Sequence, residues 1–447
     1  MEISRDMKEK VLARVNEERL ITLLQKLIQM PSPVEEDGAE KEISEYLQGY
    51  WKRMGLEVFV QDVPRFHESI PKGPHPQIIG RLKGKGGGKR FMMGGHIDTE
   101  PVVQPERWTK DPFGGFVDRE EKGIEGQGYL YGLGAANMKQ SVASFTEAVY
   151  ATIESGVDLK GDLLLSGWVL EDIGCIGSKY QVDHWNEIGV GPYPDMVLDG
   201  EPSNCEVRST HVGVSCFTIT TKGQLGHVSQ RYVRRPEYLG KRPINAFDKM
   251  FKIIAELKDM KKSFTYTRHP YIGDCILTVG DVRTKVGGKG GRPVLGSSEC
   301  QADFDLRYLP GMTTQSIQED LERVIYRLKI EDPELEASVS FWPQTVAGAT
   351  ELPRDHLLHQ VLRKAHQEVF GEEVILDIDA KGTSVNRFVD RCKYGGTDIG
   401  SFYGVGIPGT NYGAAQVPVT PDERVSIPQL VKHCKVSALT TLEICNR

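Results

Sequence analysis

Short apolar runs alternate with longer segments of helical periodicity along the first 170 residues, and this alternation constrains the fold most strongly. The helical segments have apolar side chains three and four positions apart, and the first of them ends at the proline break Met30-Pro31. The expected helices cover residues 8–30, 37–54 and 139–155, and the expected strands cover 56–60, 77–82, 90–93 and 162–170. Strands that alternate with helices are typical of a layered domain with parallel strands, so we expect an α/β fold.

A second pattern begins near residue 208 and continues to about residue 345. The expected elements are strands at 212–221, 275–281, 299–308 and 336–342 and helices at 245–259 and 313–329. This βαββαβ-like order predicts a small α+β domain inserted into the first domain. A helix at 355–370 resumes the α/β pattern. We therefore expect one domain of residues 1–207 and 346–447 and an inserted domain of residues 208–345.

Composition excludes several classes of function. Lys plus Arg total 55 and Asp plus Glu total 62, which gives a net charge of −7, whereas a nucleic-acid partner would require a basic patch. No run of about 18 apolar residues is present, so no membrane partner is expected. The N-terminal segment is charged and lacks the apolar core of a secretory signal, and the eight cysteines are dispersed without a CxxC pair. These features predict a cytoplasmic protein with reduced thiols.

Polar side chains that suit metal chemistry stand at the ends of three apolar runs. His96 and Asp98 follow one run, Glu171 and Asp172 follow another, and Glu201 follows a third. Sheets with parallel strands place their sites at the carboxyl ends of the strands. Asp98 is spaced to accept a hydrogen bond from the second ring nitrogen of His96, as carboxylates do for metal-bound histidines. Adjacent carboxylates such as Glu171 and Asp172 are stable together in water or beside a cation.

Taken alone, each motif is also compatible with an ordinary turn, and Asn137 is equally suited to cap the helix at 139–155. The order of the motifs is more specific. They run along the chain as His96-Ile97-Asp98, Gly132-Leu133-Gly134-Ala135-Ala136-Asn137-Met138-Lys139, Glu171-Asp172-Ile173-Gly174, Gly200-Glu201-Pro202-Ser203, Gly223-Gln224-Leu225-Gly226-His227, Gly395-Gly396-Thr397-Asp398 and Gly406-Ile407-Pro408. This series resembles the co-catalytic metallohydrolase family of succinyl-diaminopimelate desuccinylase, acetylornithine deacetylase, aminoacylase and glutamate carboxypeptidase.

The resemblance implies a catalytic α/β domain with a central mixed sheet flanked by helices. The inserted α+β domain would be a lid that mediates homodimer or higher homo-oligomer formation. Glu171 matches the family's general acid/base, Asp98 is assigned with it to the catalytic set, and His227 matches the lid histidine that stabilises the oxyanion. Thr397 and Asp398 would lie near the substrate. The implied partner is a small-molecule substrate.

Two metal ligands of the family are replaced here. His96, Asp172 and Glu201 match ligands, but Asn137 stands at the position of the bridging Asp and Val419 at the position of the C-terminal His. An amide offers one useful oxygen and no charge, so it is a poor bridge between two dications. Two alternatives remain: one loosely held divalent metal (Mn²⁺, Co²⁺ or Zn²⁺), bound by His96, Asn137, Asp172 and Glu201, or no metal.

A site with one metal lacks the second Lewis acid that normally polarises the scissile carbonyl. The function expected from the resemblance is therefore hydrolysis of a C–N bond in a small carboxylate-bearing molecule, as in the related 5-nitroanthranilate aminohydrolases, which replace an aryl amine with hydroxyl. Arg292 is the candidate for binding the carboxylate, and a solvated loop arginine is the alternative. An N-acyl-amino-acid deacylase or dipeptidase and a catalytically inactive scaffold protein are the other two functions that the sequence leaves open.

Overall fold

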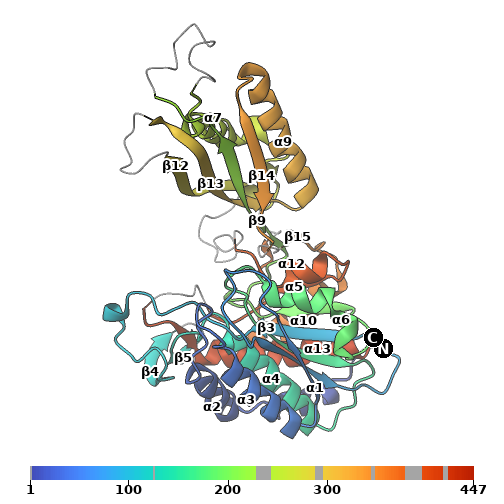
Figure 1. Ribbon diagram of the computed structural model, residues 1–447. Coiled ribbons are helices and arrows are strands. Elements are labelled where there is room, and N and C mark those ends of the chain that lie inside the picture. The colour runs from blue at the N-terminus through green and yellow to red at the C-terminus, as the bar shows by residue number, and fades with distance from the viewer. Residues whose placement is uncertain are drawn as a thin grey trace. The chain divides into compact units, whose positions relative to one another are not determined.

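The computed structural model describes residues 3–123, 126–227, 243–286, 295–343, 348–377, 395–415 and 421–447 (Figure 1). The chain divides into two compact units. Unit 1 comprises Met1–His211 and Val346–Arg447, and unit 2 comprises Val212–Thr345. Residues 208–211, which the sequence pattern placed at the start of the insertion, belong to unit 1.

Unit 1 is built on a six-stranded mixed sheet. The strand order is β1 (Glu57–Asp62), β2 (Pro76–Leu82), β6 (Leu163–Trp168), β3 (Phe91–His96), β7 (Met196–Asp199) and β16 (Gly409–Asn411). β6, β3, β7 and β16 run parallel, whereas β1 and β2 are antiparallel to their neighbours. The parallel strands are short and almost wholly buried, as expected for strands covered on both faces. The expected α/β fold with a mixed sheet is confirmed.

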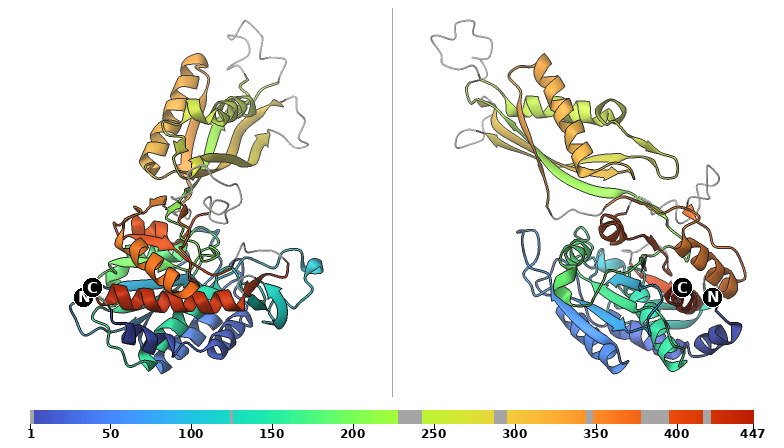
Figure 2. Two further views of the ribbon diagram at one scale, coloured as in Figure 1. Left: turned by 180° about the vertical axis from the view of Figure 1, so that it is seen from behind. Right: turned by 90° about the vertical axis from the view of Figure 1, so that its right-hand side faces the viewer.

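Helices cover both faces of this sheet (Figures 1 and 2). One face carries α3 (Lys41–Arg53) and α4 (Lys139–Glu154), which are joined by a hydrogen bond from Trp51 to Thr146, and α13 (Ile427–Cys445), which packs against α4. Outside this layer lie α1 (Arg5–Leu12), α2 (Glu17–Ile28) and α10 (Leu357–Phe370). The other face carries α5 (Ile176–Asp183), α6 (Trp185–Ile188) and α12 (Ile399–Tyr403), whose apolar residues share one core cluster with β2, β3, β6 and β7.

The helix expected at 8–30 is two helices. Asn16 interrupts the pattern because its side chain accepts a hydrogen bond from the backbone N–H of Arg19 and thereby caps α2. Short elements complete unit 1. They are η1 (Pro105–Arg107), a three-stranded sheet of β17 (Arg424–Ser426), β5 (Gly126–Tyr131) and β4 (Val117–Gly123), and the pair β8 (Thr210–His211) and β15 (Thr350–Glu351).

Unit 2 is a four-stranded antiparallel sheet with helices on one face. The strand order is β12 (Ile276–Val286), β13 (Ser297–Tyr308), β9 (Gly213–Lys222) and β14 (Glu336–Phe341), and the helices are α7 (Ala246–Lys258) and α9 (Thr314–Glu331). Burial alternates along β9 and β13, so one face of each strand packs on the helices. The pair β10 (Arg268–His269) and β11 (Gly273–Asp274) and the short α8 (Met260–Ser263) complete the unit. In the described part of the chain, no helix is long and apolar enough to cross a membrane.

Candidate metal centre

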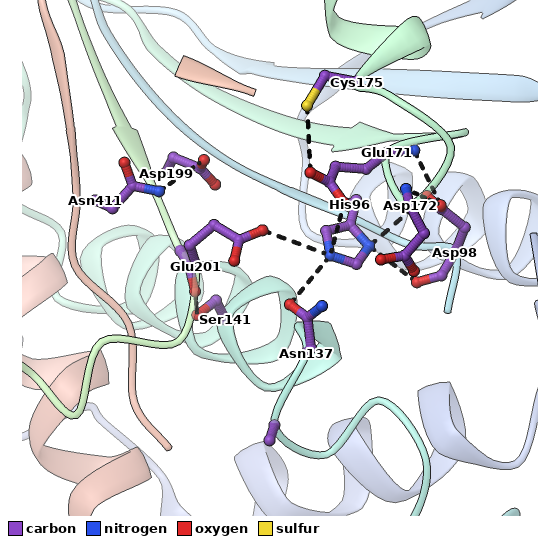
Figure 3. A network of polar contacts seen from close by, with 12 residues as sticks. His96, Asp98, Asn137, Ser141, Glu171, Asp172, Cys175, Asp199, Glu201 and Asn411 are labelled. Carbon is purple, nitrogen blue, oxygen red and sulfur yellow. Dashed lines mark hydrogen bonds and ion pairs between the residues drawn. The ribbon is translucent and has the colours of Figure 1, made fainter. Parts of the chain in front are cut away.

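Three neighbouring parallel strands bring the predicted polar residues together. His96 is the last residue of β3, Glu171 and Asp172 follow β6, and Glu201 follows β7. Because β6, β3 and β7 are adjacent and parallel, their carboxyl ends meet at one edge of the sheet. Asn137 reaches the same point from the turn before α4 (Figure 3).

His96 is fully buried at the centre of this group. Its Nδ1 lies 2.9 Å from the backbone carbonyl oxygen of Asp98, which only accepts, so Nδ1 carries the ring proton. Nε2 faces three oxygens: it lies 3.2 Å from Oδ1 of Asn137, 3.7 Å from Oε1 of Glu201 and 3.8 Å from Oε2 of Glu171. In the neutral ring Nε2 has only a lone pair. Nε2 donates to Oδ1 of Asn137 when the ring is protonated, and in the neutral ring that a cation requires, Nε2 and the surrounding oxygens offer electron pairs to a common space.

A divalent cation fits this donor set. Single ligand atoms of His96, Glu171 and Asp172 all lie within 4.8 Å of one another. Oδ2 of Asp172 is buried and has no hydrogen-bond partner among the described residues. One imidazole with several carboxylate oxygens suits Mn²⁺, Co²⁺ or Zn²⁺. The residues that could hold the metal are thus His96, Glu171 and Asp172, and the oxygens of Glu201 and Asn137 face the same ring nitrogen of His96.

The role expected for the Asp98 side chain needs correction. The nearer Asp98 carboxylate oxygen lies 3.7 Å from Nδ1 of His96, and the ring proton goes to the Asp98 backbone carbonyl instead. Oδ2 of Asp98 accepts hydrogen bonds from the backbone N–H groups of Glu171 (2.9 Å) and Asp172 (3.1 Å). The carboxylate therefore holds the turn that carries both acidic residues, a contact that residue spacing does not reveal.

Burial and crowding perturb the ionisation of the whole group. Burial alone would lower the pKa of His96, but Asp172, Asp98, Glu171 and Glu201 raise it well above its usual value. Burial raises the pKa of Glu171 and of Asp172 well above their usual range, against the opposing effect of His96. Burial also raises the pKa of Asp98 to about 6. Such an excess of buried negative charge requires protons or a cation for balance.

Glu171 has one oxygen held in place. Its Oε1 accepts a hydrogen bond from the thiol of Cys175 at 3.2 Å, whereas Oε2 faces His96. Cys175 is the fourth residue after Glu171 in the turn that leads into α5, and it is buried. Oε2 is therefore the oxygen of Glu171 that faces the centre of the group.

Glu423 organises the loop that presents Asn137. Its Oε1 accepts hydrogen bonds from the backbone N–H groups of Gly134 (3.0 Å), Ala136 (2.8 Å) and Asn137 (3.1 Å). Lys139 follows on α4, where Nζ donates to two carbonyl oxygens, and burial lowers its pKa to about 7 against the attraction of Glu423. The buried carboxylate of Glu423 thus fixes the backbone on which Asn137 stands.

Two of the other predicted site residues lie in unit 1. Thr397 and Asp398 are fully or almost fully buried at the start of α12, and burial raises the pKa of Asp398 to about 7. The negative charge of Asp398 also raises the pKa of Glu171, so the two carboxylates are electrostatic neighbours. His227 is exposed and follows β9 in unit 2. Arg292 and Val419 lie outside the described residues.

Sequence reasoning missed Cys175, Glu423 and Arg208 as residues of this region. Cys175 lies three residues after Asp172 and Glu423 four residues after Val419, but the contacts of both side chains depend on the fold. Arg208 is buried, and its charge lowers the pKa of Glu201 in opposition to burial. No spacing signal marks it.

The chain is similar to known hydrolases along nearly its whole length. The sequence pattern of peptidase family M20/M25/M40 matches residues 92–443. N-formyl-4-amino-5-aminomethyl-2-methylpyrimidine deformylase from Halalkalibacterium halodurans is 25% identical over 457 residues, which cover 98% of this chain and 97% of the deformylase. Acetylornithine deacetylase from Photorhabdus laumondii is 27% identical over 357 residues, which cover 77% of this chain and 81% of the deacetylase.

Solved structures show the same fold. Aminopeptidase PepT from Bacillus cereus has a TM-score of 0.68 at 18% identity, covering 97% of this chain and 100% of the peptidase. A dinuclear metal-binding peptidase from Bacillus subtilis has a TM-score of 0.60 at 14% identity, covering 96% of this chain and 98% of the peptidase. Both likenesses span the two units of the chain.

Proposed function

This chain belongs to peptidase family M20/M25/M40 and is a metal-dependent hydrolase of C–N bonds, and on that premise we propose that it uses one loosely held divalent metal. The observation that carries the proposal is the amide oxygen of Asn137, 3.2 Å from Nε2 of His96. A carboxylate there would add a negative charge and a second bridging oxygen, which two dications need. The neutral amide leaves His96, Asp172 and Glu201 to hold one ion.

We propose that the substrate is a small molecule with a carboxylate, and that the amine of an aromatic ring is replaced by hydroxyl. When bound, the metal would supply Lewis-acid activation of water and orient the substrate. Oε2 of Glu171 takes the proton from the attacking water while Oε1 stays on the Cys175 thiol. Glu171 then returns this proton to the leaving nitrogen. His227 of unit 2 is the proposed donor to the developing negative charge.

Removal of an acyl group is the second candidate. It is favoured by the relatives that match the chain over most of its length, among them a deformylase and a deacetylase. The two candidates are distinguished by their products, because an aryl amine releases ammonia and an N-acyl amino acid releases a carboxylic acid. An inactive scaffold would release neither and would show no dependence on metal.

We also propose that unit 2 mediates a homodimer. Four large apolar side chains are exposed on its helices: Phe247 and Phe251 on α7 and Tyr326 and Ile330 on α9. Exposed apolar groups of this kind commonly mark a protein interface. Analytical ultracentrifugation of Phe251→Asp and Tyr326→Asp variants tests this, and a wild-type chain that sediments as a monomer would contradict it.

The direct test of the mechanism is Glu171→Gln in EDTA-treated protein reloaded with Mn²⁺. We expect turnover to be lost while Mn²⁺ still binds with nearly wild-type affinity, because Glu171 serves the proton transfer. Glu187→Gln is the matched control, since its side chain is 71% exposed. Full activity of Glu171→Gln, or loss of its metal, would contradict the assignment.

A further inference from the structure

His75 is a fully buried histidine whose two ring nitrogens both face hydrogen-bond acceptors. Nδ1 lies 2.9 Å from Oε2 of Glu40, and Nε2 lies 3.0 Å from the backbone carbonyl oxygen of Pro71. A carbonyl oxygen and an ionised carboxylate only accept hydrogen bonds, whereas a neutral imidazole carries a single N–H. Both contacts are therefore satisfied only when the ring is an imidazolium with a proton on each nitrogen.

The carboxylate of Glu40 is equally buried. Glu40 is the residue before α3, and its Oε1 has no hydrogen-bond partner among the described residues. Within the same part of the chain, the cation that pairs with Glu40 is His75. A buried charge that loses its partner is strongly destabilising, so the charge of each residue depends on that of the other.

Other charged groups surround this pair from several segments. They are Asp37 and Lys72, which form an exposed ion pair with each other, Asp62 at the end of β1, and Asp98 after β3. Asp62 is the closest to the ring in the chain fold, because its Oδ1 accepts the backbone N–H of His75 at 2.7 Å. Burial and the charge of Glu40 raise the pKa of Asp98, which makes Asp98 an electrostatic neighbour of the pair. The surroundings are thus mainly negative, and they favour a positive ring.

The ring also ties together segments that the sheet does not join. Residues 63–74 connect β1 to β2 without a helix or strand. Nε2 of His75 holds this segment through Pro71, and Nδ1 holds the start of α3 through Glu40. His75 itself stands immediately before β2. One side chain thereby links the connecting segment, a helix and a strand of the main sheet.

We propose that His75 and Glu40 form a pH-sensitive clasp in unit 1, which is closed while the ring is an imidazolium and opens when the ring loses a proton. A neutral ring has one N–H, so it must release either Glu40 or Pro71. Loss of the proton also leaves the charge of Glu40 unpaired in the interior. The segment 63–74 then loses its attachment to α3. The clasp concerns the fold of unit 1 and is independent of the proposed reaction.

The direction of the pH dependence follows from the surroundings of the ring. Burial alone would lower the pKa of His75, but the hydrogen bond and charge of Glu40, the Pro71 carbonyl and Asp62 raise it above its usual value. The contribution of the clasp to the free energy of unfolding is therefore complete below about pH 6.5, where an unfolded histidine titrates. It is lost as the pH rises through the raised pKa of the folded ring, so alkaline conditions should open the clasp.

The alternative charge state has a neutral ring beside a protonated Glu40. Nδ1 of His75 would then accept from the carboxylic acid, and only Nε2 would carry a proton. Nitrogen NMR of the full chain labelled with ¹⁵N-histidine separates the two states, and His75→Gln identifies the signals of His75 by their loss. We expect protons on both ring nitrogens at about pH 7, above the usual pKa of histidine. A ring with one protonated nitrogen at this pH would overturn the proposal.

Tryptic cleavage after Arg65 and Lys72 measures release of the segment. Above the pKa of the folded ring, the open population rises up to about tenfold for each pH unit, and cleavage follows that population when opening is fast. We expect cleavage of wild type to rise by about tenfold or more between pH 7 and pH 9, relative to a free peptide of residues 61–76. His75→Gln should be cleaved rapidly at both pH values.

Two further variants complete the experiment. Glu40→Gln keeps an oxygen for Nδ1–H but removes the charge, so the rise in cleavage should move to lower pH, and this variant also serves if His75→Gln does not fold. His184→Gln is the matched control and should behave like wild type, because His184 makes the same 2.9 Å contact with Glu187 at the protein surface. An equal pH dependence of cleavage in wild type and in both clasp variants would overturn the proposal.

Discussion

Replacement of Glu423 tests how firmly the Asn137 loop is held. One oxygen of this buried carboxylate accepts three backbone N–H groups at 2.8–3.1 Å, all within Gly134–Asn137. Glu423→Ala removes the acceptor from all three groups. Glu423→Gln keeps a neutral oxygen in the same place and removes only the charge.

The magnitude follows from these three contacts. A buried N–H left without an acceptor costs roughly 1–3 kcal/mol, so Glu423→Ala should lower the free energy of unfolding by about 3–5 kcal/mol after partial relaxation of the loop. Hydrogen bonds to a charged acceptor are stronger than those to a neutral one, so Glu423→Gln should lower it by about 1–2 kcal/mol. Glu423→Ala should also weaken Mn²⁺ binding by roughly tenfold or more, because replacing a residue that orients a metal ligand generally lowers metal affinity by this factor.

The assay is urea denaturation in EDTA, followed by Mn²⁺ titration of each folded variant. Glu121→Gln is the control, because Glu121 is a partly exposed carboxylate in the neighbouring strand β4 that pairs with Arg424. A surface pair of this kind should contribute below about 1 kcal/mol. If Glu423→Ala destabilises the protein no more than Glu121→Gln does, the carboxylate does not hold the loop and the reasoning fails.

Three further perturbations have defined outcomes. Asn137→Asp combined with Val419→His should raise the Mn²⁺ stoichiometry toward two per chain in calorimetry, and an unchanged stoichiometry would mean a site shaped unlike that of the family. Burial lowers the pKa of His433 to about 4 from 6.5. The contribution of this neutral ring to the free energy of unfolding is therefore fully present above pH 6.5 and is lost as the pH falls toward 4. In urea denaturation, His433→Phe should reduce the loss of unfolding free energy between pH 7.5 and pH 5 by about 2 kcal/mol. An equal pH dependence in both proteins would contradict this. Gly94→Ala should lower the free energy of unfolding by about 1–3 kcal/mol, because its Cβ would lie 2.3 Å from the buried Trp168 ring, and an unchanged denaturation midpoint would show that the ring can move.

The sequence predicted that several polar residues of the site lie together at the carboxyl ends of parallel strands. His96, Glu171, Asp172 and Glu201 each end or follow a parallel strand, and the α/β pattern alone requires these ends to meet. The family resemblance is confirmed as well, since the family pattern matches residues 92–443. The limits of individual elements were less accurate. Strand β12 continues past 281 to Val286 because irregular pairing between Val279 and Val282 lets it resume its contact with β13.

Contacts between distant segments could not be predicted from the sequence. The carboxylate of Asp98 holds the backbone of Glu171, 73 positions away, while its own backbone carbonyl holds His96. The three bonds from Glu423 span 286 to 289 positions. Arg208 carries no motif at all, and its effect on the buried acids Asp199 and Glu201 depends on the fold alone. Such features depend on which backbone groups the fold brings into reach.

The two short strands β8 and β15 have a consequence for how this protein can evolve. Thr350 pairs with His211 across these strands, so the chain leaves unit 1 and returns to it at adjacent points. The 134 residues between Val212 and Thr345 therefore behave, for unit 1, as a long loop with its ends already joined. Closure of a loop costs little extra free energy as the loop lengthens. Unit 2 can accordingly be exchanged, enlarged or trimmed with little penalty to the sheet that carries His96.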